Sequence, residues 1–540
     1  MAKSKMRQEI EARRVVNRPL VMEKDPVHNR QENLAKALAD LKDALGEEWA
    51  TDDVSILCGY ARDQSFTPAG YPHIVCMPGS TEDVQAVYRI ANEHLIDIMP
   101  FGTGLTTAGM TIPVYGGILC DLRRMDRILE IDGENMYAVI EPGINYLELQ
   151  AAAQRLGCRV LNPSTSAPAG VISNHAFCNI NLMASKYGFG MDNIIDVEMV
   201  LPTGDILKTG PASYGAVKGH VPGPGPDLST MFRYAFGTLG IVTRMTIRLY
   251  PGAKYTQEVF PVYEKDRLSV MADALYMLAQ DNLALELAHL MNSFFGIFIG
   301  DNNREASKVS ELMPRHNIMA VFGGETQEEA DLKAHVTQKM LEEHFPMFDY
   351  MPKEALVDMT EENEFINLDK WSKFFNVTVR VMRVRGSFMI GALIDKLENM
   401  VGIEKLMREA CTNQVGTNDD PLAPDDASTY LQPYHMGRSA YMEYDMYTNQ
   451  SDKDDLIRIL MGWFRATFTA MSKGMIIAAG GGALIKGLLP MGDLMMAAIQ
   501  PNMATFMDAF THMKMTLDPN NISNRRWEYD TQTMKKFILF

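Results

Sequence analysis

The sequence contains no long apolar run and few cysteines. No stretch of about 18 uncharged apolar residues occurs, so no membrane-spanning helix is expected. Residues 1–14, MAKSKMRQEIEARR, lack the apolar centre of a signal peptide, so we expect a cytoplasmic protein. The six cysteines include no CxxC pair, so we expect isolated thiols rather than disulfides, a zinc site or an iron–sulfur cluster.

The chain has fewer basic than acidic residues overall, although its N-terminus has more basic ones. The net charge of -17 argues against nucleic acid and acidic membrane surfaces as partners. Residues 1–30 reverse this balance, with eight Lys or Arg against four Asp or Glu. We interpret residues 1–45 as a basic arm that is either solvated or packed on another subunit of a homo-oligomer.

Length and apolar content predict two folded units. A chain of 540 residues, 46% of them apolar, buries more than one core, because single cores stop growing at roughly 250 to 300 residues. Residues 46–252 alternate short strands with helices, and a 3.6-residue period predicts a helix over residues 81–95. Residues 253–489 contain helical stretches and strand-like runs such as 375–393 and 440–448, which predict a second domain built on an antiparallel sheet.

A glycine- and threonine-rich loop lies between two apolar strands in residues 99–121, MPFGTGLTTAGMTIPVYGGILCD. Gly102, Gly104 and Gly109 can adopt backbone angles that other residues resist, so successive N–H groups can converge on a pyrophosphate. The loop fits neither GxGxxG, which needs a glycine at Thr107, nor the phosphate motif GxxxxGK[ST], which needs a lysine. It is therefore either an anion-binding turn of another type or a plain connection between strands.

Further segments precede and follow this loop in a recognisable order. They are YARD (60–63), PGSTEDVQAVYRIANEH (78–94), LRRMDRILEID (122–132), IEPGINYLELQAAAQRLG (140–157), PAGVISNHAFCNINLMASKYGFGMD (168–192), VLPTGD (200–205), FGTLGIVTRMTIRLYP (236–251) and LDPNNI (517–522). Together they resemble the FAD-binding domain of the vanillyl-alcohol oxidase and p-cresol methylhydroxylase superfamily, which includes glycolate- and D-lactate-dehydrogenase-type flavoproteins. The resemblance implies an α+β fold in which residues 253–489 form an inserted α+β cap with an antiparallel sheet, and residues 490–540 return to the bipartite FAD-binding domain.

The resemblance also implies which residues contact FAD. The alternative for each of these residues is that it only shapes a turn or the core. Neither the loop GTGLTT nor the cap segment 383–391 holds a histidine, so we expect noncovalent FAD. Arg525 or Arg526 is expected to stabilise an anionic reduced flavin, unless the pair lies on the surface. The other implied contacts are Pro100, Gly102, Thr103, Gly104, Leu105, Thr106, Gly109, Gly170, Ser173, Asn174, Cys178, Asp192, Ile241 and Val242.

Most of the reactive side chains of the family's motifs are absent from the corresponding segments of this sequence. A metal-binding HxGDGNxH segment becomes HMGRSAYM (435–442) and a later glutamate–histidine–glycine becomes AAGGGALIK (478–486), so we expect no metal, because one histidine cannot hold it. Hydride transfer from an alcohol or phenol also needs a base. Our candidates for the catalytic groups are His435 as the base, Arg438 and Tyr441 beside it, and Arg380 and Arg383 on a valine-rich strand.

Four functions remain open. The first is an FAD-dependent dehydrogenase or oxidase that takes a hydride from a CH–OH or benzylic carbon of a small organic substrate and passes electrons to O2 or a partner. A second is a non-redox flavoenzyme of the alkylglycerone-phosphate synthase type. A third is a subunit that delivers electrons to an electron-transferring flavoprotein, a cytochrome or an iron–sulfur protein. The fourth is a non-enzymatic flavin-binding scaffold.

Overall fold

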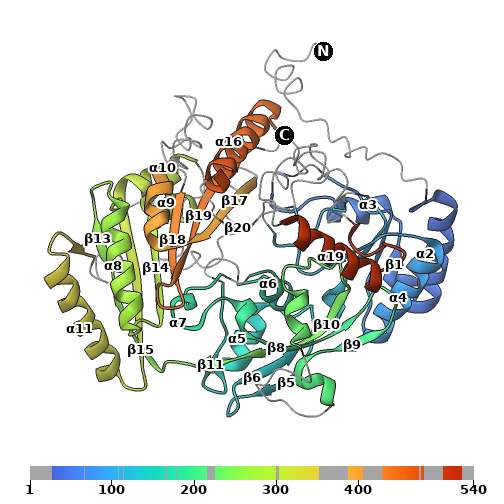
Figure 1. Cartoon of the computed structure of the whole chain (residues 1–540), viewed down its shortest axis with the longest axis horizontal. Helices are drawn as coiled ribbons and strands as arrows, with labels where there is room; N and C mark the ends of the chain where they lie inside the picture. The colour runs from blue at the N-terminus through green and yellow to red at the C-terminus, as the bar shows by residue number, and fades with distance from the viewer. Residues whose placement is uncertain are drawn as a thin grey trace.

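The computed structural model describes residues 27–65, 67, 69–106, 109–113, 115–163, 167–178, 180–215, 226–299, 303–351, 387–405, 428–449, 451–472, 476–479 and 503–525. These residues form two units that lie side by side, each built on its own sheets (Figure 1). The first unit contains the described residues up to 251 together with 503–525, and the second contains those from 255 to 479. None of the described helices is long and apolar enough to cross a membrane.

A four-stranded sheet, in the order β1-β2-β4-β3, forms one layer of the first unit. Its elements are α2 (Gln31–Leu45), β1 (Ala50–Thr51), α3 (Val54–Leu57), β2 (Ile74–Cys76), α4 (Thr81–His94), β3 (Ile98–Phe101) and β4 (Ile118–Asp121). Strands β2, β4 and β3 are parallel, and β1 is antiparallel to β2. The helix expected over residues 81–95 is confirmed as α4, because the Ser80 side chain accepts the N–H of Asp83 at its start and Leu95 ends it in a left-handed conformation.

A five-stranded antiparallel sheet, in the order β5-β6-β10-β8-β9, forms the second layer of this unit. The elements in this part of the chain are β5 (Ile128–Asp132), β6 (Tyr137–Ile140), α5 (Tyr146–Gln154), β7 (Cys158–Arg159), α6 (Val171–Phe177), α7 (Ala184–Tyr187), β8 (Ile194–Val200), β9 (Ile206–Lys208), β10 (Ile241–Arg248) and β11 (Tyr250–Pro251). Strands β7 and β11 pair with each other in a separate two-stranded sheet. A capping box between Asn145 and Glu148 starts α5, whose Leu149 packs with Ile140 and Met245 in the core. Helices α6 and α7 continue from this core toward the second unit (Figure 1).

The second unit is built on a nine-stranded sheet, which confirms the antiparallel sheet predicted for this part of the chain. Its order is β16-β13-β15-β14-β18-β19-β17-β20, and β12 also pairs with β15. The elements are β12 (Tyr255–Val259), β13 (Pro261–Tyr263), α8 (Leu268–Asp281), β14 (Glu286–Met291), α9 (Asn292–Ile299), α10 (Asn303–Leu312), β15 (His316–Gly324), α11 (Gln327–His344), β16 (Asp349–Tyr350), β17 (Ser387–Asp395), β18 (Ser428–Tyr434), β19 (Ser439–Thr448), α16 (Lys453–Ser472) and β20 (Ile476–Ala479).

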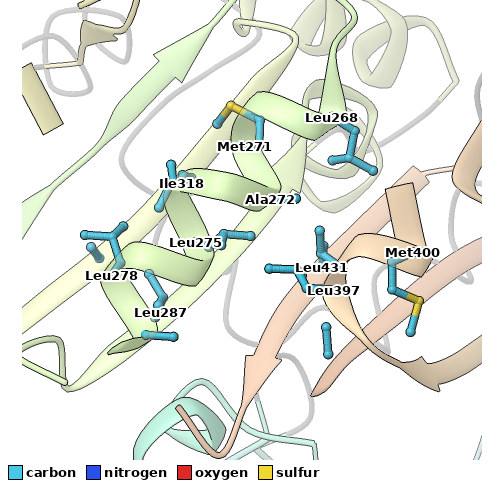
Figure 2. Packing of buried hydrophobic residues seen from close by; sticks show 14 of the residues in the cluster. Leu268, Met271, Ala272, Leu275, Leu278, Leu287, Ile318, Leu397, Met400 and Leu431 are labelled. Atoms are coloured by element: carbon cyan, nitrogen blue, oxygen red, sulfur yellow. The ribbon is translucent and has the colours of Figure 1, made fainter. Parts of the chain in front are cut away.

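The two faces of this large sheet have different partners. On one face, Leu275 of α8 packs with Ile318 and Leu431 in the unit's own core (Figure 2). On the other face, Tyr441 belongs to a cluster that also contains Phe189 of the first unit. The second face therefore meets the first unit at Phe189 and also packs on Phe294 of α9 and Val309 of α10.

The C-terminal residues return to the first unit. Helix α19 (Met503–Leu517) packs on its core, and the segment after it joins the edge of the four-stranded sheet beside β3. The N–H of Ile98 donates to the carbonyl of Ile522 at 2.8 Å, and the N–H of Asn524 donates to the carbonyl of Ile98 at 2.8 Å. The bipartite fold expected from the sequence is thus present (Figure 1).

Candidate functional site

The glycine-rich loop and a distant second segment meet at one place in the first unit. Strand β3 ends at Phe101, and the loop that follows approaches the start of α6. There the N–H of Gly170 donates to Oγ1 of Thr103 at 3.0 Å. A Cβ added at Gly102 would lie 3.5 Å from Oγ of Ser173. The structure therefore brings together two groups of residues that the sequence implies for the pyrophosphate.

The donors at this meeting point are available to a ligand. Within the described part of the chain, the N–H groups of residues 102–105 and the side-chain amide of Asn174 make no hydrogen bond to protein. Gly104 has φ +73°, a conformation that aims successive N–H groups toward one side of a turn. Unused backbone donors and a carboxamide suit the oxygens of a diphosphate, so these residues fit the FAD that the resemblance implies.

The remaining implied contacts lie around this loop or behind it. Pro100 touches the turn at Gly237, where an added Cβ would lie 2.4 Å from Cγ of Pro100. Gly109 has φ +69°, and the carbonyl of Thr106 accepts the N–H of Gln64 at 3.1 Å, so both residues shape the loop. Ile241 is buried in the core behind the loop, and Val242 is half-buried beside it on β10.

Arg525 has a role that the sequence did not indicate. Its guanidinium forms two bonds to buried Asp97, from Nε to Oδ1 at 2.6 Å and from Nη2 to Oδ2 at 2.8 Å, and it stacks over the ring of Tyr115. This arrangement ties the C-terminal return to the loop before β3 and gives Arg525 a structural role, while its contribution of charge to the flavin stays a prediction. Arg526 lies outside the described residues.

Cys178 lies at the end of α6 in an apolar, aromatic wall. It is buried together with Tyr234, whose ring packs on Phe177 and Phe236. Burial raises the pKa of the Cys178 thiol to about 12, so the thiol is neutral at ordinary pH. Cys178 therefore contributes to the wall by its shape and not as a nucleophile.

Asp192 joins the two units. Its Oδ2 accepts the hydroxyl of Tyr434 at 2.6 Å and the N–H of Phe189 at 3.1 Å. His435 Nε2 lies 3.6 Å from the same oxygen, and Arg233 Nη1 lies 3.9 Å from Oδ1. Burial, followed by the bond to Asp192, raises the pKa of Tyr434, so its phenol stays protonated as a donor.

His435 lies in the turn that docks the β18–β19 hairpin onto α7. The N–H groups of His435 and Met436 donate to the carbonyls of Ala184 at 3.2 Å and Ser185 at 2.7 Å. His435, Met436 and Gly437 all have positive φ, a strained run that fixes the shape of the turn. The candidate base is therefore held at the junction of the units by its backbone.

Arg438 and Tyr441, the groups expected beside His435, are separated from each other by the structure. Arg438 is exposed after the turn, and its N–H donates to the carbonyl of His435 at 3.3 Å. Tyr441 is 1% exposed, and its hydroxyl donates to Oε2 of Glu443 at 2.8 Å. Arg380 and Arg383 lie outside the described residues.

Three polar residues beside Tyr441 were not identified from the sequence. Across the β18–β19 pair, Glu443 lies opposite Tyr430, and Tyr441 lies opposite Gln432. The hydroxyl of Tyr430 donates to the Gln432 side chain, whose amide donates to the carbonyl of Asn181 in the first unit. Strand alternation in AYMEYDMYT places 441 and 443 on one face, and this was the signal available in the sequence.

Comparison with known proteins agrees with this geometry. Residues 72–210 match the family model for an FAD binding domain. This part of the chain is an FAD-binding domain. Glycolate oxidase subunit GlcD of Bacillus subtilis (strain 168) is 32% identical over 206 residues, which are 38% of this chain and 43% of that protein. The chain thus spans less than half the length of this curated relative.

Solved structures extend the likeness to the second unit. The p-cresol methylhydroxylase structure with substrate bound has a TM-score of 0.77 at 19% identity and covers 91% of this chain and 96% of that one. The 4-ethylphenol oxidase structure from Gulosibacter chungangensis has a TM-score of 0.78 at 18% identity and covers 93% and 97%. The described residues therefore share the fold of p-cresol methylhydroxylase, and we call the second unit the cap.

Proposed function

We propose that the chain is an FAD-dependent oxidoreductase, a dehydrogenase or oxidase that takes a hydride from a CH–OH or benzylic carbon of a small organic substrate. FAD, when bound, supplies the acceptor for the hydride. The proposal depends above all on one observation: residues 102–105 lie beside Gly170 and Asn174 inside the matched FAD-binding domain. The N–H groups of residues 102–105 and the amide of Asn174 are not used by the protein there and can bind a diphosphate. The similar oxidase and methylhydroxylase sequences and structures support it.

Each part of the chain then has a task. The N–H groups of residues 102–105 and the amide of Asn174 hold the diphosphate, and the face of the cap with Tyr441 closes over the FAD-binding domain and excludes water. We further propose that the electrons pass to O2 or to a protein, either an electron-transferring flavoprotein, a cytochrome or an iron–sulfur subunit. A homo-oligomer in the cytoplasm is part of the same proposal.

The experiment that tests the function is an anaerobic screen of the purified protein by flavin absorbance. Aliphatic and benzylic alcohols, 4-alkylphenols and 2-hydroxy acids are added one class at a time, and the protein is then denatured. We expect one class to bleach the flavin band and the denatured chain to release FAD, which would also establish noncovalent binding.

Two other outcomes would contradict the proposal. If FAD is bound but no class bleaches it, the non-redox reading of the alkylglycerone-phosphate synthase type or the scaffold reading replaces it. If the protein holds no FAD even after reconstitution, residues 102–105 and Asn174 do not serve a flavin, and the function fails altogether.

A further inference from the structure

The C-terminal return holds a strained turn against the base of the glycine-rich loop. In this turn Tyr234, Phe236 and Gly237 have φ +58°, +50° and +75°. Such angles are uncommon for aromatic residues and persist where the surrounding structure fixes them. Oγ of Ser523 donates to the carbonyl of Gly237 at 2.7 Å, and Nδ2 of Asn524 donates to the carbonyl of Phe236. Two side chains of the return therefore fix the turn.

The turn lies directly against the start of the loop. A Cβ added at Gly237 would lie 2.4 Å from Cγ of Pro100, which stands two residues before Gly102. The backbone N–H of Asn524 donates to the carbonyl of Ile98, the first residue of β3, at 2.8 Å. Asn524 is thus fixed on one side by the strand that leads into the loop and on the other side by the turn that touches Pro100.

Asn524 uses only half of its side-chain amide in this arrangement. Among the described residues, its Oδ1 has no hydrogen-bond partner, although the residue is only 4% exposed. The carbonyl of Phe236 requires a donor, so the atom that faces it is the amide nitrogen and the unused atom is the oxygen. A buried acceptor without a donor costs free energy, so this oxygen calls for a partner outside the described protein groups.

The chemistry of the unused atom limits what that partner can be. An amide oxygen cannot bind the diphosphate of FAD, because diphosphate oxygens are acceptors too. It needs a hydroxyl or an N–H group. FAD carries hydroxyl groups on the ribityl chain and on the ribose, one on each side of the diphosphate that we propose for residues 102–105. A hydroxyl next to the diphosphate is therefore the donor expected at the base of the loop.

We propose that Asn524 is an FAD-binding residue whose Oδ1 accepts a hydrogen bond from a hydroxyl group of the ribityl chain or of the ribose. The proposal rests on the FAD-dependent function proposed above. FAD then joins three distant segments of the chain: the loop at residues 102–105, the start of α6 at Gly170 and Asn174, and the C-terminal return at Asn524. The return thus contributes to the cofactor site in addition to closing the fold.

A double-mutant cycle on FAD affinity tests this contact without turnover. The FAD-free wild type and Asn524→Ala are titrated with FAD and with FAD analogues that each lack one hydroxyl of the ribityl chain or of the ribose. Asn524→Ala should weaken FAD binding about tenfold. With the analogue that lacks the partner hydroxyl, the same substitution should weaken binding by less than about threefold, because the hydrogen bond is already absent. That analogue also shows which of the two chains supplies the hydroxyl.

Equal losses of affinity for FAD and for every analogue would overturn the proposal, because the substitution would then act only through the turn at Phe236. If Asn524→Ala does not fold, Asn524→Gly replaces it, since glycine adopts the φ of +37° found at this position without strain. Asn524→Gly should show the same selective loss, and an equal loss for every ligand in this variant would overturn the proposal too.

Asn521→Ala is the matched control in the same segment. Asn521 also has a left-handed backbone, with φ +52°, and a buried Oδ1 without a hydrogen-bond partner among the described residues. Its N–H donates to the carbonyl of Asp518 at 3.0 Å rather than to β3. Asn521→Ala should bind FAD within about twofold of the wild type, as expected of a substitution that removes no ligand contact. A tenfold loss in this variant would mean that any change in the return disturbs the site.

The failure of this proposal can be told apart from the failure of the proposed function. If Asn524→Ala binds FAD as tightly as the wild type and a substrate class bleaches the flavin, Asn524 is not a cofactor contact but the oxidoreductase function stands. If the wild type binds no FAD, both proposals fail. If FAD binds and the cycle shows coupling but no compound bleaches the flavin, Asn524 is confirmed as an FAD contact and only the oxidoreductase function fails.

Discussion

Two carboxylates, one in each unit, show how differently the units use acidic side chains. Asp97 in the FAD-binding domain is buried and is held by Nε and Nη2 of the Arg525 guanidinium. Glu443 in the cap keeps partial exposure and accepts the phenol of Tyr441. The difference indicates that Asp97 serves the fold, whereas the Glu443 carboxylate stays partly in contact with solvent.

The energetics of the Asp97–Arg525 pair support a structural role. Burial raises the pKa of Asp97, and the bonds and charge of Arg525 act in the opposite direction. A buried pair of this kind adds little net stability, because the cost of removing two charges from water offsets their attraction. Removing one partner is different, because the other charge then stays buried without its counter-ion.

The largest predicted effect comes from breaking this pair. Arg525→Met should lower the free energy of unfolding by about 3–5 kcal/mol, measured by urea denaturation at saturating FAD. The control is Lys254→Met, which breaks the exposed pair with Glu325 and should cost under about 1 kcal/mol. A stable Arg525→Met protein with a shifted flavin potential would instead restore the sequence-based role of Arg525 beside the flavin.

A second prediction concerns a buried histidine of the FAD-binding domain. Burial lowers the pKa of His175 from 6.5 to about 4. Between these values the unfolded chain binds a proton that the native state does not, so stability falls as the pH falls from about 6.5 to about 4. The loss attributable to His175 should be about 3 kcal/mol, from the shift of its pKa.

The loss of stability is measured as the difference between the urea midpoints at about pH 7.5 and pH 4. Buried neutral histidines lower stability in acid because they bind a proton when the chain unfolds. His175→Gln should reduce the difference between the two midpoints, whereas His512→Gln, at an exposed position, should leave it unchanged. An identical acid sensitivity in His175→Gln and wild type would show that other groups dominate the loss.

A third prediction compares two glycines with nearly the same φ angle. Gly104 and Gly157 have φ +73° and +70°, but an added Cβ lies 2.7 Å from Cζ of Phe101 at Gly104 and meets nothing within 4 Å at Gly157. Gly104→Val should weaken FAD binding about tenfold to hundredfold, because the ring of Phe101 and the loop must both shift. Each substitution also carries backbone strain of about 1–3 kcal/mol.

Reconstitution of the FAD-free proteins, followed by flavin absorbance, gives the two affinities. Gly157→Val serves as the matched control, with the strain but without the clash. Equal losses of FAD affinity in both variants would mean that strain alone acts, and that the loop at Gly104 has no special relation to the cofactor.

The FAD-binding domain was more predictable from sequence than the cap. Local signals such as the Ser80 cap of α4 and the glycines of the loop specify structure within a few residues. They predicted the helix α4 and the glycine-rich turn after β3. The partner of Arg525 was not predictable, because Asp97 is 428 residues away and only the folded return brings the two together.

The chemistry of the cap was harder to predict, for a physical reason. Strand β19 carries tyrosines on both faces, with Tyr441 toward the FAD-binding domain and Tyr444 in the cap's own core. Alternation separates these faces but does not say which one meets the other domain, so the side chains at the contact between the units could not be identified from the sequence. His435 was chosen because of the residual HxG pattern, which the structure shows to be a docking turn.

The smallest predicted effect is that of His435→Gln, which tests whether His435 is the base. The docking contacts of this residue come from its backbone N–H, and its ring lies 3.6 Å from Asp192 with 41% of the side chain exposed. An exposed ion pair contributes up to about 1 kcal/mol, so stability should change by no more than that. Flavin reduction, followed by stopped-flow, should stay within about threefold of wild type, the margin that separates a peripheral residue from a general base. A loss of about a hundredfold in His435→Gln would instead make His435 the base, because the proton would then leave through the junction at Asp192.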